Sequence, residues 1–268
     1  MTTIWDLFSL QGKVAIVTGG AGRLGSQMCD ALAEAGAHVV VASRNLDRCQ
    51  AKVEALLKQG HPRPFAVATD ITSRESVHSM AQAVLGQFGK IDILINNAYS
   101  GTAKPFEEMT AQEFESSLTG ALTGTFLCSQ AVSETMRAHR SGVIVNISSI
   151  YGLVSPDHRI YGRTGLNNPP NYGAAKAGVV QLTRYLATYL APHQIRVNCI
   201  TPGGFYDPKL SSRPDYDAVF VKNYVSKTPL GRMGNESDLK GAVVYLASKA
   251  SCYVTGHNLV VDGGWTAW

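Results

Sequence analysis

The stretch KVAIVTGGAGRLG, residues 13–25, decides the fold of this chain. It joins a short β-branched apolar run to a cluster of glycines, and SQMCDALAEAG, residues 26–36, follows with helical spacing of its apolar residues. A strand that ends in glycines and leads into a helix is typical of the first unit of a doubly wound α/β domain. The rest of the chain repeats this order of strand and helix.

Six further β-branched runs follow, separated by segments with helical spacing. They are HVVVASR (38–44), PFAVATD (64–70), IDILINNA (91–98), GVIVNISS (142–149), IRVNCITPG (195–203) and NLVVDGG (258–264). Such alternation favours right-handed crossovers and a parallel sheet covered on both faces. We therefore predict an α/β, three-layer, doubly wound Rossmann fold with a seven-stranded, mostly parallel sheet, built as one domain over residues 1–268.

The composition favours a soluble protein that binds small molecules. Of 268 residues 45% are hydrophobic and 16% charged, and the net charge of +4 comes without a dense Lys/Arg run, so nothing indicates nucleic acid. No apolar run reaches membrane-spanning length, and the first residues lack a signal-peptide pattern. The five scattered cysteines indicate reduced thiols. We expect a cytoplasmic protein with no membrane partner.

The glycine cluster predicts a phosphate-binding loop. Gly19 permits a tight turn and Gly25 permits close packing of helix on strand, so that backbone N–H groups and the helix dipole face a pyrophosphate. Gly22, Arg23 and Leu24 complete the loop. A purely structural turn is the alternative, but the position after the first strand favours dinucleotide binding.

The end of the second strand indicates which dinucleotide. Folds that prefer NAD carry a carboxylate there, whereas this chain has Ser43 and Arg44. A guanidinium can bind a 2′-phosphate bidentately, and Arg23 would add a second positive charge. A solvated surface arginine is the alternative for Arg44. We predict NADP(H) as the favoured cofactor and NAD(H) as the second choice.

Two further strand ends supply cofactor contacts. Asp70, after the third strand, is placed to accept a hydrogen bond from the adenine amino group, with Ile71 beside it. The run NNA places Asn97 and Ala98 along the adenosine ribose. Because ligands of such sheets bind at the carboxyl ends of the strands, all these residues are expected at one edge.

The motifs TGGAGRLG, NNA, NISS, YGAAK and TPGG, in this order and spacing, resemble the short-chain dehydrogenase/reductase family. The resemblance covers nearly the whole chain. It implies a Rossmann-type domain, a nicotinamide cofactor, no metal, and a homotetramer or homodimer. It also implies cofactor contacts from Pro202, Gly203 and Phe205, and interconversion of a secondary alcohol and a ketone.

The family's Tyr-x-x-x-Lys pattern falls on Tyr172 and Lys176. A lysine at i+4 lies on the same helix face, and its ammonium favours the phenolate of a group whose reference pKa is near ~10. Tyr161 has Gly165 at i+4 and lacks this support. Tyr172 is thus expected to be the general acid/base, with Lys176 also holding the nicotinamide ribose. Ser149 is expected to orient the substrate oxygen.

Four positions depart from the family pattern. They are Arg23 in the glycine loop, Tyr99 after NNA, Asp207 after TPGG, and Ala121 where the family has an asparagine that supports a water relay. A methyl group cannot hold that water by hydrogen bonds. Either Thr119, Thr123 or the backbone replaces it, or the relay is slower, or the protein binds nucleotide without turnover.

The segment between Ser149 and Tyr172, 23 residues apart, is longer than the family usually shows. We hypothesise that it covers the substrate pocket and offers Arg159 or Arg163 to a carboxylate or phosphate. A solvated loop or a subunit contact is the alternative. Tyr99 and Tyr151 are further expected substrate contacts.

Two C-terminal segments complete the expectations. Residues 205–232 look like a mobile substrate loop, and Trp265 and Trp268 would be exposed apolar groups unless a second subunit covered them. The expected substrate is a polar sugar, polyol or sugar acid. The alternatives are a 3-oxoacyl-carrier-protein substrate, or a nucleotide-binding homologue with weak activity.

Overall fold

Seven parallel strands form one sheet at the centre of the computed structural model, which describes residues 2–268. The strand order is β3-β2-β1-β4-β5-β6-β7. The strands are β1 Val14–Thr18, β2 His38–Ser43, β3 Phe65–Ala68, β4 Ile93–Asn96, β5 Gly142–Ile147, β6 Ile195–Pro202 and β7 Asn258–Val261. The predicted α/β doubly wound fold is confirmed, and the strand pairs are all parallel.

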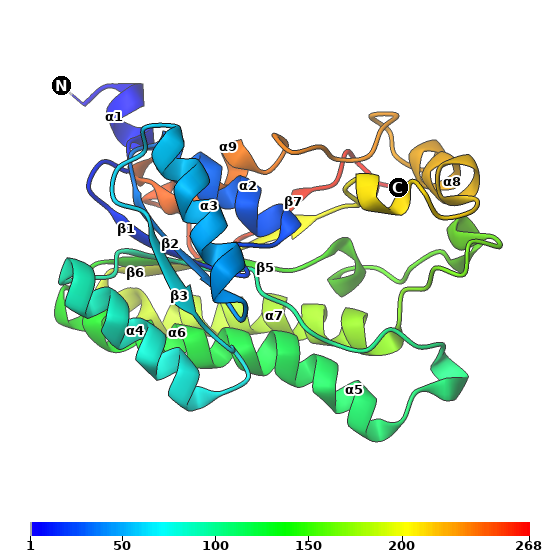
Figure 1. Ribbon diagram of the computed structural model, residues 1–268, viewed down its shortest axis with the longest axis horizontal. Helices are drawn as coiled ribbons and strands as arrows, with labels where there is room; N and C mark the ends of the chain where they lie inside the picture. The colour runs from blue at the N-terminus through cyan, green and yellow to red at the C-terminus, as the bar shows by residue number, and fades with distance from the viewer. Residues whose placement is uncertain (1) are drawn as a thin grey trace.

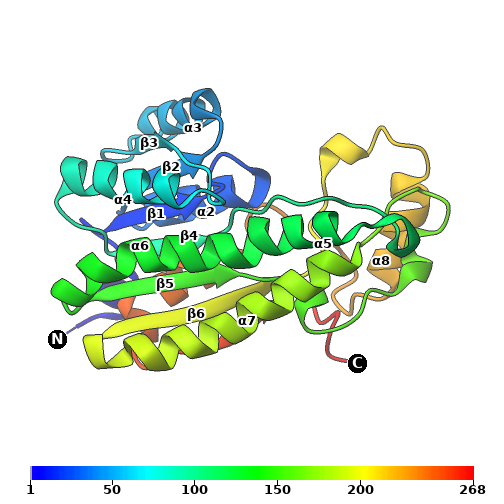
Figure 2. The ribbon, with the colours of Figure 1, turned by 90° about the horizontal axis from the view of Figure 1, so that it is seen from below.

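Helices cover both faces of the sheet, with α2, α3 and α9 on one side and α4, α6 and α7 on the other (Figures 1 and 2). The α-helices are α1 Ile4–Phe8, α2 Arg23–Glu34, α3 Leu46–Lys58, α4 Arg74–Phe88, α5 Ala111–Leu118, α6 Gly124–Ala138, α7 Pro170–Leu190, α8 Lys222–Ser226 and α9 Lys240–Ala247. A π-helix, Thr119–Thr123, joins α5 to α6, and a second, Tyr216–Val221, precedes α8. None of the described helices is both long and apolar enough to cross a membrane.

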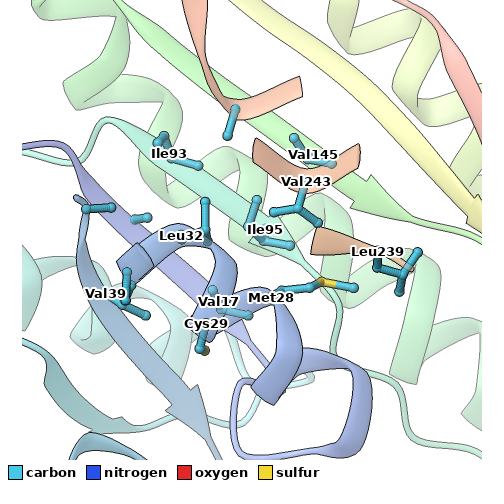
Figure 3. Packing of buried hydrophobic residues seen from close by; sticks show 14 of the residues in the cluster. Val17, Met28, Cys29, Leu32, Val39, Ile93, Ile95, Val145, Leu239 and Val243 are labelled. Atoms are coloured by element: carbon cyan, nitrogen blue, oxygen red, sulfur yellow. The ribbon is translucent and has the colours of Figure 1, made fainter. Parts of the chain in front are cut away.

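The core explains why the strands read as continuous apolar runs. Neighbouring residues of β1 face opposite sides, so Val17 packs in the cluster with α2 and α9 while Ile16 packs in the cluster with α4 and α6. In the first cluster Met28 and Leu32 of α2 meet Ile95 of β4 (Figure 3). A strand buried on both faces is apolar at nearly every position.

A third apolar cluster lies beyond the carboxyl ends of β5 and β6, around α8 (Figures 1 and 2). Trp265 belongs to it, only 8% exposed, with its ring stacked on Tyr224 and edge-on to Tyr151. The expectation that both C-terminal tryptophans are exposed is therefore wrong for Trp265, because aromatic side chains of its own chain cover it. Trp268 is 81% exposed.

Candidate functional site

A cleft of about 380 Å³ lies at the carboxyl ends of the first four strands. It brings together predicted cofactor residues from all of them: Gly19, Gly22, Arg23, Leu24, Gly25, Ser43, Arg44, Asp70, Ile71, Asn97 and Ala98. Its volume is within the range of roughly 300–1,000 Å³ that is usual for ligand pockets. The residues Asn45, Arg48, Thr69 and Ser100 also line it and were not predicted.

The glycine loop is held flat against the NNA segment. Asn97 Nδ2 donates hydrogen bonds to the carbonyl oxygens of Thr18 and Gly19, at 3.0 and 3.2 Å. Gly19 has φ +66°, and a Cβ at Gly25 would lie 2.1 Å from the Gly19 carbonyl oxygen. Only glycine fits these two positions, so the loop presents bare backbone to the cleft.

The first turn of α2 has backbone N–H donors that no capping side chain accepts. At the start of α3, α4 and α5, the side chain of the capping residue accepts a hydrogen bond from a backbone N–H of the first turn; these residues are Asn45, Ser73 and Thr110. Helix α2 begins after Gly22 and has no such side-chain cap. The unpaired N–H groups of such a terminus, together with the helix dipole, favour an anion. The residues present thus fit a dinucleotide pyrophosphate.

Two arginines lie near the end of β2. Arg44 lines the cleft, and Arg48 in the first turn of α3 lines it too while donating to the Ala21 carbonyl oxygen at 2.9 Å. The expected second charge, Arg23, also lines the cleft, and its Nη1 donates to the carbonyl oxygens of Phe205 and Tyr206, at 2.9 and 2.7 Å. Its contact with a 2′-phosphate stays a prediction. Arg48, four residues after Arg44, was not predicted as a second positive charge at this end of the cleft.

Asp70 is ionised at neutral pH. Its Oδ1 accepts hydrogen bonds from the backbone and the hydroxyl of Thr72, at 2.9 and 2.7 Å, and these bonds, the backbone one first, lower the pKa of the carboxyl. Since the side chain also lines the cleft, it can act as the acceptor that the sequence predicts for an adenine amino group.

A second cavity, of about 440 Å³, lies at the ends of β5 and β6. It is lined by the predicted residues Ser149, Tyr151, Tyr172, Pro202, Gly203 and Phe205. Arg23 and Leu24 line both cavities, so the two adjoin. Tyr99, an expected substrate contact, lines only the cofactor cleft.

Lys176, one turn after Tyr172 on α7, is 5% exposed. Its Nζ donates to the Ile147 carbonyl oxygen at 2.9 Å, and burial lowers its pKa to about 8. Ser148 Oγ donates to the Lys176 carbonyl oxygen at 2.8 Å, which is a structural role. The end of β5 and the first turns of α7 therefore hold Ser149, Tyr172 and Lys176 as one group.

The phenol of Tyr172 is protonated in this structure. Burial raises its pKa, the Ser149 hydroxyl lowers it by hydrogen bonding, and the neighbouring Tyr99 raises it; the net shift is upward. The expected lowering by Lys176 is not seen, because the ammonium is directed to the Ile147 carbonyl and lies 5.8 Å from the Tyr172 ring centroid. Tyr172 thus holds its proton at neutral pH.

The segment between Ser149 and Tyr172 covers the second cavity, but not with its arginines. Arg159 donates to Asp157 and Arg163 to Asp215, and both side chains are more than four-fifths exposed. The expectation that either faces the substrate is wrong, because surface carboxylates pair with both outside the cavity. The segment instead lines the cavity with Leu166, Asn167 and Asn168.

Asn167 is the polar group that the sequence reasoning did not assign. Its Nδ2 is buried and has no hydrogen-bond partner among residues 2–268. Since buried amide donors are nearly always paired, an unpaired one in the wall of this cavity is unusual. Its only sequence signal was its place in the unusually long segment.

Aromatic rings form the far wall of the second cavity. Tyr216, Phe220 and Tyr224 line it at helical spacing, and Tyr161 stacks on Phe220 with centroids 5.6 Å apart. Tyr161 Oη donates to Tyr151 Oη at 3.4 Å. Tyr161 is thus a wall residue, and the i, i+4, i+8 spacing in YDAVFVKNY was the signal for the other three.

Across residues 2–268 no three His, Cys, Asp or Glu side chains gather as a metal site requires.

A family model described as enoyl-(acyl carrier protein) reductase matches residues 20–266. The 5-keto-D-gluconate 5-reductase of Escherichia coli is 33% identical over 97% of both chains. A gluconate 5-dehydrogenase from Burkholderia cenocepacia, solved with NADP and tartrate, has a TM-score of 0.87 and 30% identity over 99% of this chain and 100% of that one. A short chain dehydrogenase from Leptospira borgpetersenii with bound NAD⁺ has a TM-score of 0.84 and 37% identity over 99% and 96%.

Proposed function

The chain belongs to the short-chain dehydrogenase/reductase family, and on this premise we propose that it interconverts a secondary alcohol and a ketone with NADP(H), or with NAD(H) as the second choice. The observation that carries the proposal is the group of Ser149, Tyr172 and Lys176 at a cavity that adjoins the cleft lined by the glycine loop. We propose that residues 1–268 form one domain.

In the reducing direction the residues divide the work as follows. Ser149 Oγ donates a hydrogen bond to the ketone oxygen and stabilises the charge that develops there. Tyr172 Oη gives its proton to that oxygen and, in the oxidising direction, takes it back. Lys176 places a positive charge beside the phenolate that is left. A nicotinamide bound in the cleft would supply or accept the hydride.

The cofactor preference rests on Arg44 and Arg48. Both line the cleft after β2, where no carboxylate is present to select a ribose 2′-hydroxyl. The related structure with NADP supports the first choice and the one with NAD⁺ supports the second. The loop residues Gly19, Gly22 and Gly25 would hold the pyrophosphate.

For the substrate we propose a polar sugar, polyol or sugar acid. The related 5-keto-D-gluconate reductase supports a hydroxylated substrate. Asn167 Nδ2 offers one neutral donor, and Asp207 adds a carboxylate to the lining. Arg159 and Arg163 are paired outside the cavity, so neither would meet a substrate carboxylate. The second candidate is a 3-oxoacyl-carrier-protein substrate, which the aromatic wall of the cavity could accommodate. The third is a weakly active nucleotide-binding homologue, which is favoured by Ala121 in place of the family's asparagine.

We further propose a cytoplasmic homodimer or homotetramer. On α7, Tyr185 and Tyr189 stack on each other and are 59% and 57% exposed, and Trp268 is also exposed. The exposed, stacked pair on α7 supports a subunit contact there. Light scattering on the purified protein tests the assembly, and a monomer at micromolar concentration would contradict it.

The experiment that tests the reaction is NADPH oxidation with a panel of ketoses, keto acids and acyl thioesters. Tyr172→Phe should lower kcat by about 10²–10⁴-fold while leaving NADPH binding intact. Tyr253→Phe is the matched control, because the Tyr253 side chain is fully exposed and lines neither cavity. Equal activity of Tyr172→Phe and the native protein would refute the proposal. Tight NADPH binding without turnover on any substrate would favour the third candidate.

A further inference from the structure

Tyr99 stands after β4, against the two residues of α7 that carry the proposed chemistry. Its ring centroid lies 5.1 Å from that of Tyr172, with the two planes at 87°. The Lys176 Nζ lies 5.6 Å from the Tyr99 ring centroid and 5.8 Å from that of Tyr172. Both distances are within the roughly 6 Å over which an aromatic ring attracts a cation.

Lys176 has little else to stabilise its charge. An ammonium carries three donor protons, and the hydrogen bond to Ile147 is the one that Nζ makes within residues 2–268. Ala121, one of two buried residues in the π-helix before α6, has only a methyl group where the family resemblance implies an asparagine. Because a buried charge needs compensating partners, the two rings are the main support left for the ammonium.

The Tyr99 ring is itself fixed in place. Its Oη lies 3.4 Å from Ser117 Oγ, and Ser117 Oγ accepts a hydrogen bond of 2.7 Å from Asn171 Nδ2. Ser117 and Asn171 are fully buried. Since Asn171 directly precedes Tyr172, one chain of contacts sets both the ring and the start of α7.

We propose that Tyr99 is a positioning residue whose ring holds the Lys176 ammonium, in its charged form, beside Tyr172. The inference rests on the proposed function for the roles of Tyr172 and Lys176. Tyr99 acts through Lys176, consistent with its place in the cofactor cleft and not in the substrate cavity.

The other titratable groups that face Lys176 do not supply this effect. Tyr172 lies on the same helix and keeps its proton, because its pKa is raised. Cys199 of β6 acts on the lysine through its charge, but burial raises the pKa of this thiol to about 11, so it is neutral below that pH. Ring and lysine can therefore be tested without interference between pH 6 and pH 10.

Progressive fluorination of the ring tests the proposal. Position 99 receives phenylalanine and then its 4-fluoro, 3,5-difluoro and 3,4,5-trifluoro forms, which weaken the negative ring face with little change of shape. In cofactor-free protein with ¹³C-labelled lysine, the Cε signal of Lys176 is followed against pH and assigned by its loss in Lys176→Met. The pKa of Lys176 should fall stepwise, by about half to one and a half pH units in total. No trend along the series would overturn the proposal.

The same series at Tyr189, on the outer part of α7, is the matched control and should leave Lys176 unchanged. With any substrate that the native protein turns over, the alkaline limb of kcat should move to lower pH along the series at position 99. An immobile alkaline limb would count against the proposal. If no substrate is turned over, the proposed function fails, yet the lysine titration still decides the role of Tyr99.

Discussion

Replacing Arg44 by glutamine should weaken NADPH binding and leave NADH binding unchanged. Arg44 follows β2 and lines the cleft, and the matched residue in folds that prefer NAD is a carboxylate. Glutamine keeps much of the side-chain length and its hydrogen-bonding capacity but removes the charge. The change therefore isolates the attraction of the guanidinium for a 2′-phosphate.

The size of the effect follows from exposure. A hydrogen bond to a charged group contributes about 1.5–3 kcal/mol, and solvent moves an exposed pair such as this one to the low end. About 1.5 kcal/mol corresponds to roughly a tenfold rise of the NADPH Kd. Arg48→Gln should have a similar effect, and the double variant should approach a hundredfold if the two contacts are independent.

Fluorescence titration with NADPH and NADH measures both constants, at low and at physiological salt, since screening should reduce the effect. Arg163→Gln is the matched control, because Arg163 is paired with Asp215 outside both cavities. If Arg44→Gln left the ratio of the NADPH and NADH Kd values unchanged, whether neither affinity fell or both fell equally, the reasoning would be refuted.

Three further changes test other parts of the site. Asn167→Asp replaces the unpaired cavity donor by a carboxylate, so KM should rise about tenfold with kcat nearly unchanged, and an unchanged KM in steady-state kinetics would exclude a substrate contact. Gly25→Ala places a Cβ 2.1 Å from the Gly19 carbonyl oxygen and should cost about 1–3 kcal/mol in urea unfolding and abolish NADPH binding, whereas Gly86→Ala on the open face of α4 should not destabilise. Burial lowers the pKa of Lys176 from 10.5 to about 8. Between these two pH values the unfolded chain binds more protons than the folded one, so the free energy of unfolding should rise with pH. In Lys176→Met the free energy of unfolding should lack this rise between pH 8 and pH 10.

The sequence predicts the sheet because each strand and turn is specified by residues that are close together in the chain. Each strand is a short β-branched run, and the glycines at positions 19 and 25 are required by the backbone and by close contacts of the loop itself. The Tyr172–Lys176 spacing is likewise a property of one helix. Such features are independent of what the rest of the chain does.

The errors arose where a side chain chooses among partners distant in sequence. Arg163 finds its carboxylate at Asp215, 52 residues away in the sequence. Trp265 is covered by Tyr224 for the same reason. The direction of the Tyr172 pKa shift depends on burial, which spacing along a helix does not reveal.

The strand order has a consequence for how the chain reaches this state. β1 lies near the middle of the sheet, with β2 as one neighbour and the much later β4 as the other, so that Ala15 pairs with both Val39 and Ile93. During synthesis one edge of β1 has no native partner until β4 has emerged. Pairings of this range make folding slow, and an apolar strand left open in the meantime is a point at which chaperones or aggregation can intervene.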